Sequence, residues 1–370
     1  MKKILFLIHD LGQGGAEKVL VNLVNNMDRS KFDISVTALF GGGVNEQFLR
    51  PDIHYHTVFP REVPGNSHMM KLLTPAQLHD LCVKEHYDIE VSYLEGPSAR
   101  VVSGCRDADT KLVCWIHCTL PSVKAAAASF RSTAEAQACY GKFDRIICVS
   151  QWSQQAFRAV FPGIEHVDVL YNTVESDRIL SQADEPVAGD FFREAETALI
   201  AVGSLKPVKA LDRLIRIHHR LRREGYPVRT YLLGQGPDLE KLRTQAAECG
   251  CSDSVTFLGY DTNPYKYVKK SDLLVCSSHS EGFSTAVTEA LIVGTPVCTV
   301  EVSGMKEMLG EHNEYGVVTE NDEEALYRGI RCLLDDPALL AHYKEKAKER
   351  GRTFRTETTV KATEEMLLAL

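Results

Sequence analysis

The stretch that decides the fold runs over residues 280–291, SEGFSTAVTEAL, and is followed by GTPV at 294–297. Two glutamates, Glu281 and Glu289, lie eight positions apart across a glycine turn. The apolar run at 273–276 before them predicts a buried strand. Both carboxylates are therefore expected near the carboxyl end of a strand, which is where open α/β sheets bind their ligands.

A helix is predicted directly after the turn, with Ser284 or Thr285 as its N-cap and its end at about Val293. The start of a helix presents unpaired N–H groups and a partial positive charge, which suit a diphosphate. Glu289, about one turn inside, can accept two hydrogen bonds from a ribose diol, and Glu281 can reach a sugar. The alternative is an ordinary helix carboxylate and a solvated turn residue, because two glutamates at this spacing are a weak signal alone.

The start of the chain shows a strand, a glycine loop and a helix in succession. Residues 3–8 form a continuous apolar run of the kind buried in a parallel sheet, and the loop 12–17 leads into an amphipathic helix over 18–26. The loop lacks G-x-G-x-x-G spacing, and no carboxylate placed for a ribose follows the next strand, so dinucleotide binding is not supported. Glycines such as Gly14 and Gly15 instead allow a ligand to approach the backbone.

Apolar runs recur along the whole chain in two series that alternate with helical patterns, which predicts two doubly wound α/β domains. Strands are expected at 4–8, 34–39, 89–94, 112–116, 145–149 and 167–170, and then at 198–202, 229–233, 255–258, 273–276, 297–300 and 316–318. The polar stretch 175–189, which contains Pro and Gly, is expected to be the linker. Residues 54–70 and 120–137 are expected to be long loops or helical segments.

Composition agrees with a two-domain soluble protein. The chain has 370 residues, of which 44% are hydrophobic and 25% charged. The formal net charge of −8 argues against nucleic acid as the main partner. The basic run 213–223 has apolar residues at helical spacing, so we expect a helix that covers a sheet and has a solvated basic face, rather than a membrane-binding segment.

The eleven cysteines are scattered through predicted strands and helices. This pattern favours reduced, buried thiols in a cytoplasmic protein. Cys114, His117 and Cys118, and likewise Cys249 with Cys251, lack the paired knuckles of a structural zinc site, so no metal is expected. The first apolar run is short and begins a strand, and no window approaches about 18 uninterrupted apolar residues. We therefore expect a cytoplasmic protein, or one peripheral to the inner face of the cell membrane.

Six motifs, taken in their order and spacing, resemble the retaining glycosyltransferases with the GT-B fold, the large group 1, family 4 type that includes sucrose-phosphate synthases, mannosyltransferases and bacterial capsule enzymes. They are GQGGAE at 12–17, WIH at 115–117, VGSLKPVK at 202–209, LLGQG at 232–236, FLG at 257–259, and residues 281–297. The resemblance covers nearly the whole chain.

The resemblance implies two Rossmann-like domains that face a central cleft. The first, residues 1–174, would bind the acceptor, and the second, residues 190–353, would bind the nucleotide sugar. The last helix, about 354–370, would pack back on the first domain.

A cation is available where a strand ends at Gly203 and the next loop brings Lys209. It could stabilise the negative charge that grows on a departing nucleoside diphosphate, although a solvated lysine is the alternative. The family usually has arginine at the position of Ser204 and glycine at the position of Ala210. A serine supplies neither the charge nor the planar fork of a guanidinium, so diphosphate stabilisation would rest more on Lys209 and the helix start, or on an arginine elsewhere.

By resemblance, the catalytic residues are His117, which would contact the transferred sugar, with Lys209 and Glu281. A lone histidine at a strand end could also be a purely structural residue. The expected donor-binding residues are Gly14, Gly15, Gly203, Ser204, Lys209, Gly259, Tyr260, Glu281, Gly282, Phe283, Ser284, Thr285 and Glu289. Within that set, the segment 282–285 would bind sugar hydroxyls and phosphates, and Gly259 and Tyr260 would hold the base.

The expected reaction is a retaining transfer from a nucleotide-diphosphate sugar, with a UDP-sugar favoured over a GDP-sugar. The resemblance implies a front-face path in which the leaving phosphate helps to deprotonate the acceptor. No metal and no cofactor are expected, because Lys209 and the helix start could neutralise the phosphates. The acceptor would be a glycan or lipid-linked glycan in bacterial-type polysaccharide synthesis (capsule or exopolysaccharide) or glycoconjugate synthesis.

Two other classes of function remain open from the sequence. A nucleotide-sugar epimerase or a glycan phosphorylase would share the two-domain architecture. A non-catalytic partner subunit of a glycosyltransferase is suggested by Ser204, which replaces the usual arginine.

Overall fold

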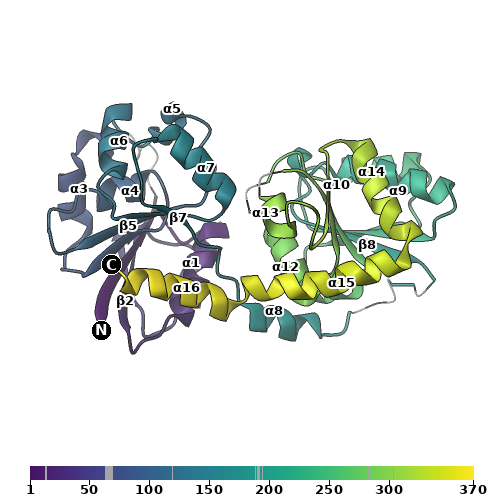
Figure 1. Ribbon diagram of the computed structural model, residues 1–370, viewed down its shortest axis with the longest axis horizontal. Helices are drawn as coiled ribbons and strands as arrows, with labels where there is room; N and C mark the ends of the chain where they lie inside the picture. Colours follow the sequence, from purple (N-terminus) through teal and green to yellow (C-terminus); the bar gives the residue numbers. More distant parts are fainter. Residues whose placement is uncertain are drawn as a thin grey trace. The chain divides into compact units, whose positions relative to one another are not determined.

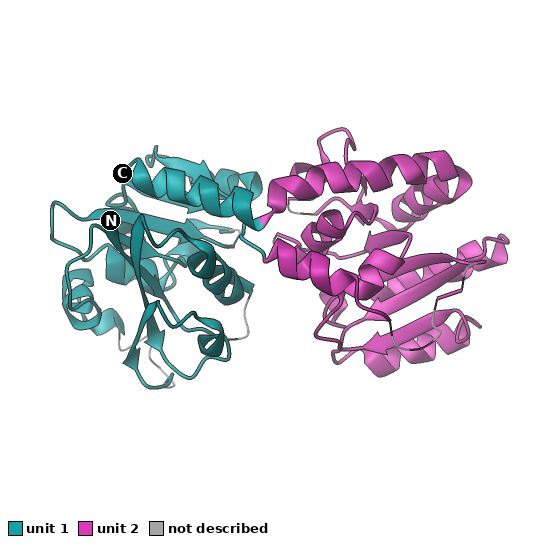
Figure 2. Cartoon of the chain, turned by 90° about the horizontal axis from the view of Figure 1, so that it is seen from below, with its two compact units in different colours: residues 1–174, 356–370 teal, residues 175–355 magenta. Residues whose placement is uncertain are grey.

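The computed structural model describes residues 1–12, 15–62, 70–118, 120–187, 189, 192–193, 195–281, 283–302 and 304–370. The chain forms two compact units, residues 1–174 with 356–370, and residues 175–355 (Figure 2).

Unit 1 is built on a seven-stranded parallel sheet with the strand order β3-β2-β1-β4-β5-β6-β7. The strands are β1 (Lys2–Ile8), β2 (Phe32–Phe40), β3 (His54–Phe59), β4 (Ile89–Ser92), β5 (Lys111–Ile116), β6 (Arg145–Cys148) and β7 (Val167–Val169). The helices are α1 (Gly15–Asn26), α3 (Pro75–Cys82), α4 (Pro97–Val102), α5 (Val123–Ala126), α6 (Thr133–Tyr140), α7 (Gln151–Val160) and α16 (Thr356–Leu368), with a 3₁₀ turn η1 (Glu46–Phe48).

Helices cover both faces of this sheet, which explains why its central strands are mostly apolar. In β1, Leu5 and Leu7 pack with α3, α4, α6 and α7, whereas Ile4 and Phe6 pack with α1 and α16. The final helix α16 lies beside α1 (Figure 1). Its Glu364 accepts hydrogen bonds from the Asp28 N–H at 2.6 Å and from Lys31 Nζ at 2.9 Å, so the end of the chain completes the core of unit 1.

Unit 2 is built on a six-stranded parallel sheet with the order β10-β9-β8-β11-β12-β13. The strands are β8 (Thr197–Val202), β9 (Val228–Leu233), β10 (Val255–Gly259), β11 (Leu273–Cys276), β12 (Val297–Val300) and β13 (Val317–Thr319). The helices are α8 (Ser176–Ala183), α9 (Leu211–Arg223), α10 (Leu239–Glu248), α11 (Tyr265–Lys270), α12 (Thr285–Val293), α13 (Met305–Leu309), α14 (Glu323–Asp335) and α15 (Pro337–Gly351), with 3₁₀ turns η2 (Pro207–Lys209) and η3 (Arg352–Phe354).

The predicted fold class is confirmed, because each unit is a doubly wound α/β domain with a parallel sheet. Every predicted strand is present, with its ends shifted by at most two residues. Among the described residues, none of the helices is both long enough and apolar enough to span a bilayer.

Two segments differ from the sequence prediction. The segment 54–70, expected as loop or helix, begins with the edge strand β3, whose His54 and His56 side chains are exposed. Its residues 63–69 lie outside the described residues. The expected linker 175–189 contains helix α8, which packs on α11 and α12 through an apolar side that includes Ile179 and Ala183. Both elements are short and mostly polar, so their sequences lack the long apolar runs of buried strands and helices.

Candidate functional site

Three glycine loops meet at the carboxyl end of the unit 2 sheet. The Gly203 N–H donates to Leu233 O at 3.0 Å, and the Gly234 N–H donates to Gly259 O at 2.8 Å. Gly234 has φ 147°, and a Cβ there would lie 1.9 Å from the Gly203 oxygen. Only glycine fits this contact, so the loops that follow β8 and β9 pack directly against each other.

The Lys209 side chain lies against Gly203, in the loop that follows β8. It ends the turn η2, and a Cβ on Gly203 would be 3.3 Å from Lys209 Cε. Gly203 also has φ 152°, a conformation that side chains disfavour. The glycine therefore leaves space for the lysine chain above the end of β8. Ser204, next to it, is half-buried.

The carboxylate of Glu281 binds the Lys209 ammonium group with both oxygens, at 2.7 and 2.9 Å. Ser278 Oγ donates to Glu281 Oε1 at 2.5 Å, and Cys276 Sγ lies 3.7 Å from the same oxygen. The side chains of the ion pair are only 24% and 11% exposed. Gly203, Lys209, Glu281 and Ser284 line one pocket, so the structure brings these four predicted site residues together.

Helix α12 begins at this pocket, as predicted. Ser284 is its N-cap and accepts a hydrogen bond from the Val287 N–H at 3.5 Å, and Gly294 ends it with φ 81°. Thr285, the first helical residue, is exposed. The first-turn N–H groups of a helix have no partner within the helix, so this end suits an anionic ligand.

Glu289 lies in the second turn of α12 and is half-buried. Its Oε1 accepts a hydrogen bond from the Tyr265 hydroxyl at 3.4 Å. Burial, and then the nearby Glu289 charge, raise the pKa of Tyr265 well above its usual value. The phenol consequently stays a hydrogen-bond donor and orients the glutamate.

A buried arginine supports the loop that carries these groups. Arg213, only 4% exposed, donates to Ser277 O and, at 3.0 Å, to Asn321 Oδ1. Ser277 Oγ in turn donates to Lys209 O at 2.9 Å. Arg213 was expected on a solvated face of α9, and this was wrong for that residue, because β11 ends beside the first turn of the helix and supplies its carbonyl partner.

The remaining donor-side residues are less closely gathered. Gly259 has φ 74° at the end of β10, and the next residue, Tyr260, is 68% exposed. The Phe283 ring packs edge-to-face on Phe354 at 6.0 Å between centroids.

Gly15, an expected donor-binding residue of unit 1, begins helix α1. Gly14 and Gly282 lie outside the described residues.

His117 follows β5 in unit 1. Its backbone N–H donates to Glu95 Oε2 at 2.9 Å, and its ring lies 4.9 Å from the Tyr93 ring. The ring Nε2 is buried and has no hydrogen-bond partner among the described residues. Burial lowers the pKa of His117 to about 4, against the opposing charge of Glu95, so the imidazole is neutral near pH 7.

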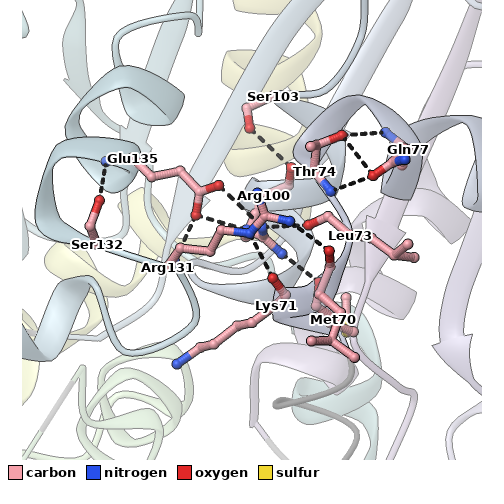
Figure 3. A network of polar contacts seen from close by, with 11 residues as sticks. Met70, Lys71, Leu73, Thr74, Gln77, Arg100, Ser103, Arg131, Ser132 and Glu135 are labelled. Atoms are coloured by element: carbon pink, nitrogen blue, oxygen red, sulfur yellow. Dashed lines mark hydrogen bonds and ion pairs between the residues drawn. The ribbon is translucent and has the colours of Figure 1, made fainter.

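Two arginines fix a segment of unit 1 that follows β3 in the chain (Figure 3). Arg100 donates to Met70 O at 2.8 Å and to Leu73 O at 2.7 Å, and Arg131 donates to the two carbonyls between them, at 2.6 and 2.7 Å. Glu135 accepts from Arg100 Nε at 3.1 Å and from the Arg131 N–H at 2.6 Å. The network joins the segment 70–73 to the segment 120–137.

Sequence reasoning missed Ser278, Tyr265 and the buried role of Arg213. The polar triplet 277–279 after an apolar strand was a usable signal for Ser278, because ligands collect at strand ends. Tyr265 lies twenty-four positions before Glu289, and no sequence pattern relates the two.

Comparison with known proteins gives matches over both units. The family model "Glycosyl transferases group 1" matches residues 188–350, and the model "Glycosyltransferase Family 4" matches residues 13–178. Among curated proteins, the chain is 28% identical over 362 residues to the N-acetylgalactosamine-N,N'-diacetylbacillosaminyl-diphospho-undecaprenol 4-alpha-N-acetylgalactosaminyltransferase of Campylobacter jejuni, with 96% of each chain covered.

Solved structures with the same fold cover the full length. Anabaena HepE in complex with UDP has a TM-score of 0.78 and 21% identity, with 100% of both chains covered. The lipopolysaccharide outer core galactosyltransferase WaaB in its apo form has a TM-score of 0.74 and 17% identity, with 99% of both chains covered. The chain belongs to the group 1 glycosyltransferases and has the GT-B fold.

Proposed function

We propose that this glycosyltransferase moves a sugar from a UDP-sugar to a glycan or lipid-linked glycan, with retention of configuration and without a metal ion. The observation that carries the proposal is the pocket in unit 2 where Lys209, Glu281 and the start of α12 converge. The cation and the helix N-terminus suit the diphosphate of a nucleotide sugar, and the carboxylate suits its hydroxyls.

We assign each part of the donor to one of these groups. The diphosphate lies against the start of α12 and contacts Lys209. This lysine stabilises the negative charge that develops on the diphosphate as the glycosidic bond breaks. Glu281 holds the lysine in place before the donor arrives and then accepts hydrogen bonds from sugar hydroxyls. Glu289, oriented by Tyr265, binds the ribose diol, and the exposed ring of Tyr260 stacks on the base.

His117 serves the transferred sugar from unit 1. As a neutral imidazole it can donate or accept a hydrogen bond with a sugar hydroxyl. The leaving phosphate assists deprotonation of the acceptor on the front face, so no protein nucleophile is required.

Metal independence rests on the cationic groups available to the phosphates. Lys209 and the start of α12 supply positive charge directly at the pocket. The acidic pair Asp107 and Asp109 precedes β5 at the amino end of the unit 1 sheet, which is the end opposite to the one where parallel sheets bind ligands.

Two relatives support the choice of substrates. The Campylobacter jejuni enzyme is, by its name, a transferase for a diphospho-undecaprenol-linked acceptor, and HepE was solved with UDP. We therefore place the reaction in bacterial-type polysaccharide (capsule or exopolysaccharide) or glycoconjugate synthesis, in the cytoplasm or at the inner face of the cell membrane.

A thermal-shift panel of UDP, GDP, ADP and their sugar conjugates, with and without magnesium, tests the donor. UDP at about 100 times its dissociation constant should stabilise the protein by about 2.7 kcal/mol without magnesium. Glu289→Ala should abolish that shift, whereas Glu240→Ala, on the surface of α10, should keep it. NMR of the product's anomeric proton then tests retention. If no nucleotide stabilises the protein, the non-catalytic partner reading replaces this proposal.

A further inference from the structure

A second polar cluster lies in unit 1, among the helices on one face of the sheet. A ring nitrogen of His79, a carboxylate oxygen of Glu90 and the sulfur of Cys105 all lie within 4.8 Å of one another. His79 is on α3, Glu90 is on β4, and Cys105 follows α4. The three side chains therefore come from three different elements.

Glu90 occupies an unusual position for a carboxylate. It pairs in the sheet with Leu5 of β1 on one side and with Leu112 of β5 on the other, and it is 2% exposed. Within the described part of the chain, only His79 hydrogen-bonds to it, with Nε2 at 2.8 and 3.1 Å from the two oxygens. Burying a charged group costs several kcal/mol unless its partners compensate, so one histidine leaves most of this carboxylate's bonding capacity unused.

Cys105 lies near this carboxylate because the backbone at Gly104, just before it, packs closely against the first turn of α3. A Cβ on Gly104 would lie 2.0 Å from Pro75 O, so only glycine lets the end of α4 touch the first turn of α3. Asp80 and Arg106 pair at 2.7 Å across the same junction. Cys105 is consequently held 8% exposed beside the His79–Glu90 pair.

We propose that His79, Glu90 and Cys105 bind one zinc ion, which joins α3, β4 and the end of α4. Nitrogen, oxygen and sulfur from these three side chains are the ligands zinc takes in proteins, and three of them with one water complete its tetrahedron. Ligand atoms about 2.0–2.3 Å from a tetrahedral zinc lie about 3.3–3.7 Å apart. The His79 and Glu90 atoms need to separate by only about half an ångström from their 2.8 Å contact to reach that spacing.

Binding at this site is an exchange of protons and not a redox step. Cys105 would bind zinc as its thiolate, so the thiol proton must leave when the metal binds. Zinc displaces that proton to solvent and binds the thiolate, while the Glu90 carboxylate supplies the second negative charge. The ion thus neutralises the charge buried in the sheet.

The site is separate from the donor pocket, which lies in unit 2. Its structural effect is on the helix pair α3 and α4, and α4 carries Arg100, which holds the segment 70–73. Zinc should therefore stabilise unit 1 and the segment that Arg100 fixes, without taking part in sugar transfer.

Metal titration of the full-length protein tests the proposal. The chelator-treated protein should take up one equivalent of zinc in competition with a chromophoric chelator, and its melting temperature should rise. Cobalt(II) in place of zinc should give the charge-transfer absorption of a thiolate–cobalt bond. Cys105→Ser should remove that absorption and lower zinc affinity by at least about 100-fold.

Cys82→Ser is the matched control, because Cys82 is also 8% exposed and lies on α3, one turn after His79. It should leave both the affinity and the cobalt spectrum unchanged. His79→Gln retains a hydrogen-bond donor for Glu90 but loses the imidazole, and should weaken zinc binding while circular dichroism confirms a folded chain. Absence of stoichiometric binding, or equal binding by wild type and Cys105→Ser, would overturn the proposal.

Discussion

At the scale of single residues, Lys209 is the side chain on which the proposed chemistry depends most. We expect Lys209→Ala to lower kcat by about 10² to 10³, because it removes a cation that acts on the charge of the leaving diphosphate. Lys206→Ala is the control, since Lys206 lies in the same loop, is exposed and does not line the pocket. Steady-state transfer assays on both variants provide the measurement. Equal losses in the two would show that the loop, and not the Lys209 charge, matters.

Ala210 carries backbone strain that can be measured. It has φ 47° in the left-handed region and is 1% exposed. Glycine there relieves about 1–2 kcal/mol of strain but loses about 0.8 kcal/mol of methyl burial and about 0.4–1 kcal/mol of unfolded-state entropy. We therefore expect the free energy of unfolding of Ala210→Gly to match wild type within about 0.8 kcal/mol.

The helical Ala246, equally buried at 1%, is the control for that measurement. Ala246→Gly loses the same methyl and gains no relief of strain, so it should cost about 1.5–2 kcal/mol. Urea unfolding of the two variants gives the comparison. A similar loss of unfolding free energy in Ala210→Gly and Ala246→Gly would mean that Ala210 is not strained in solution.

At the scale of secondary-structure elements, His218 joins helix α9 to the sheet of unit 2. Its ring is fully buried, with Nδ1 2.9 Å from Thr230 Oγ1 and Nε2 2.9 Å from Ser254 Oγ. Burial, and then the charges of Arg222 and Arg229, lower the pKa of His218 to about 4. The folded protein thus keeps this imidazole neutral at a pH where the unfolded chain, with a pKa of about 6.5, protonates it.

Acid should accordingly destabilise this junction. Because the unfolded state binds the proton first, the contribution of His218 to stability is complete above about pH 6.5 and is lost as the pH falls towards 4. From about pH 7.5 to pH 5 the loss is about 2 kcal/mol. His218→Gln should lower stability at neutral pH but flatten this decline, measured by urea unfolding. His342→Gln, on the exposed side of α15, should keep the wild-type slope, and a wild-type slope in His218→Gln would contradict the assignment.

Elements differ in how far their sequences reveal them. The strand β11, at Leu273–Cys276, was predicted to the residue because a strand buried on both faces of a parallel sheet is usually a continuous apolar run. The edge strand β3 and helix α8 were missed, because solvent covers one side of each and permits polar residues there.

The site divides in the same way. Glu281, Lys209 and the N-cap Ser284 could be named as candidates because each lies close in sequence to a strand end or a helix start, and the structure gathers them in one pocket. Arg213 and Tyr265 were not, because their contacts with Asn321 and Glu289 exist only once distant segments have folded together. Local sequence specifies the elements and their ends. The positions of the residues that support the site, such as Arg213 and Tyr265, depend on tertiary contacts.

At the scale of the whole molecule, the two units have separate hydrophobic cores. Two clusters lie within unit 1, on either face of its sheet, and the third lies within unit 2. Cooperative unfolding follows a shared core, so two units with separate cores should unfold in two steps. We expect calorimetry to resolve two transitions.

Each transition should respond to a different perturbation. A saturating nucleoside diphosphate should raise only the transition of unit 2, where the proposed donor pocket lies. Glu364→Ala should lower only the transition of unit 1, by a few degrees, because it removes the acceptor for Lys31 and for the Asp28 N–H, a loss of about 1–2 kcal/mol. Glu365→Ala, the exposed neighbour on α16, is the control and should move neither transition. A single transition that shifts equally with nucleotide and with Glu364→Ala would show that the units unfold as one body, and the C-terminal helix would then stabilise the whole chain and not unit 1 alone.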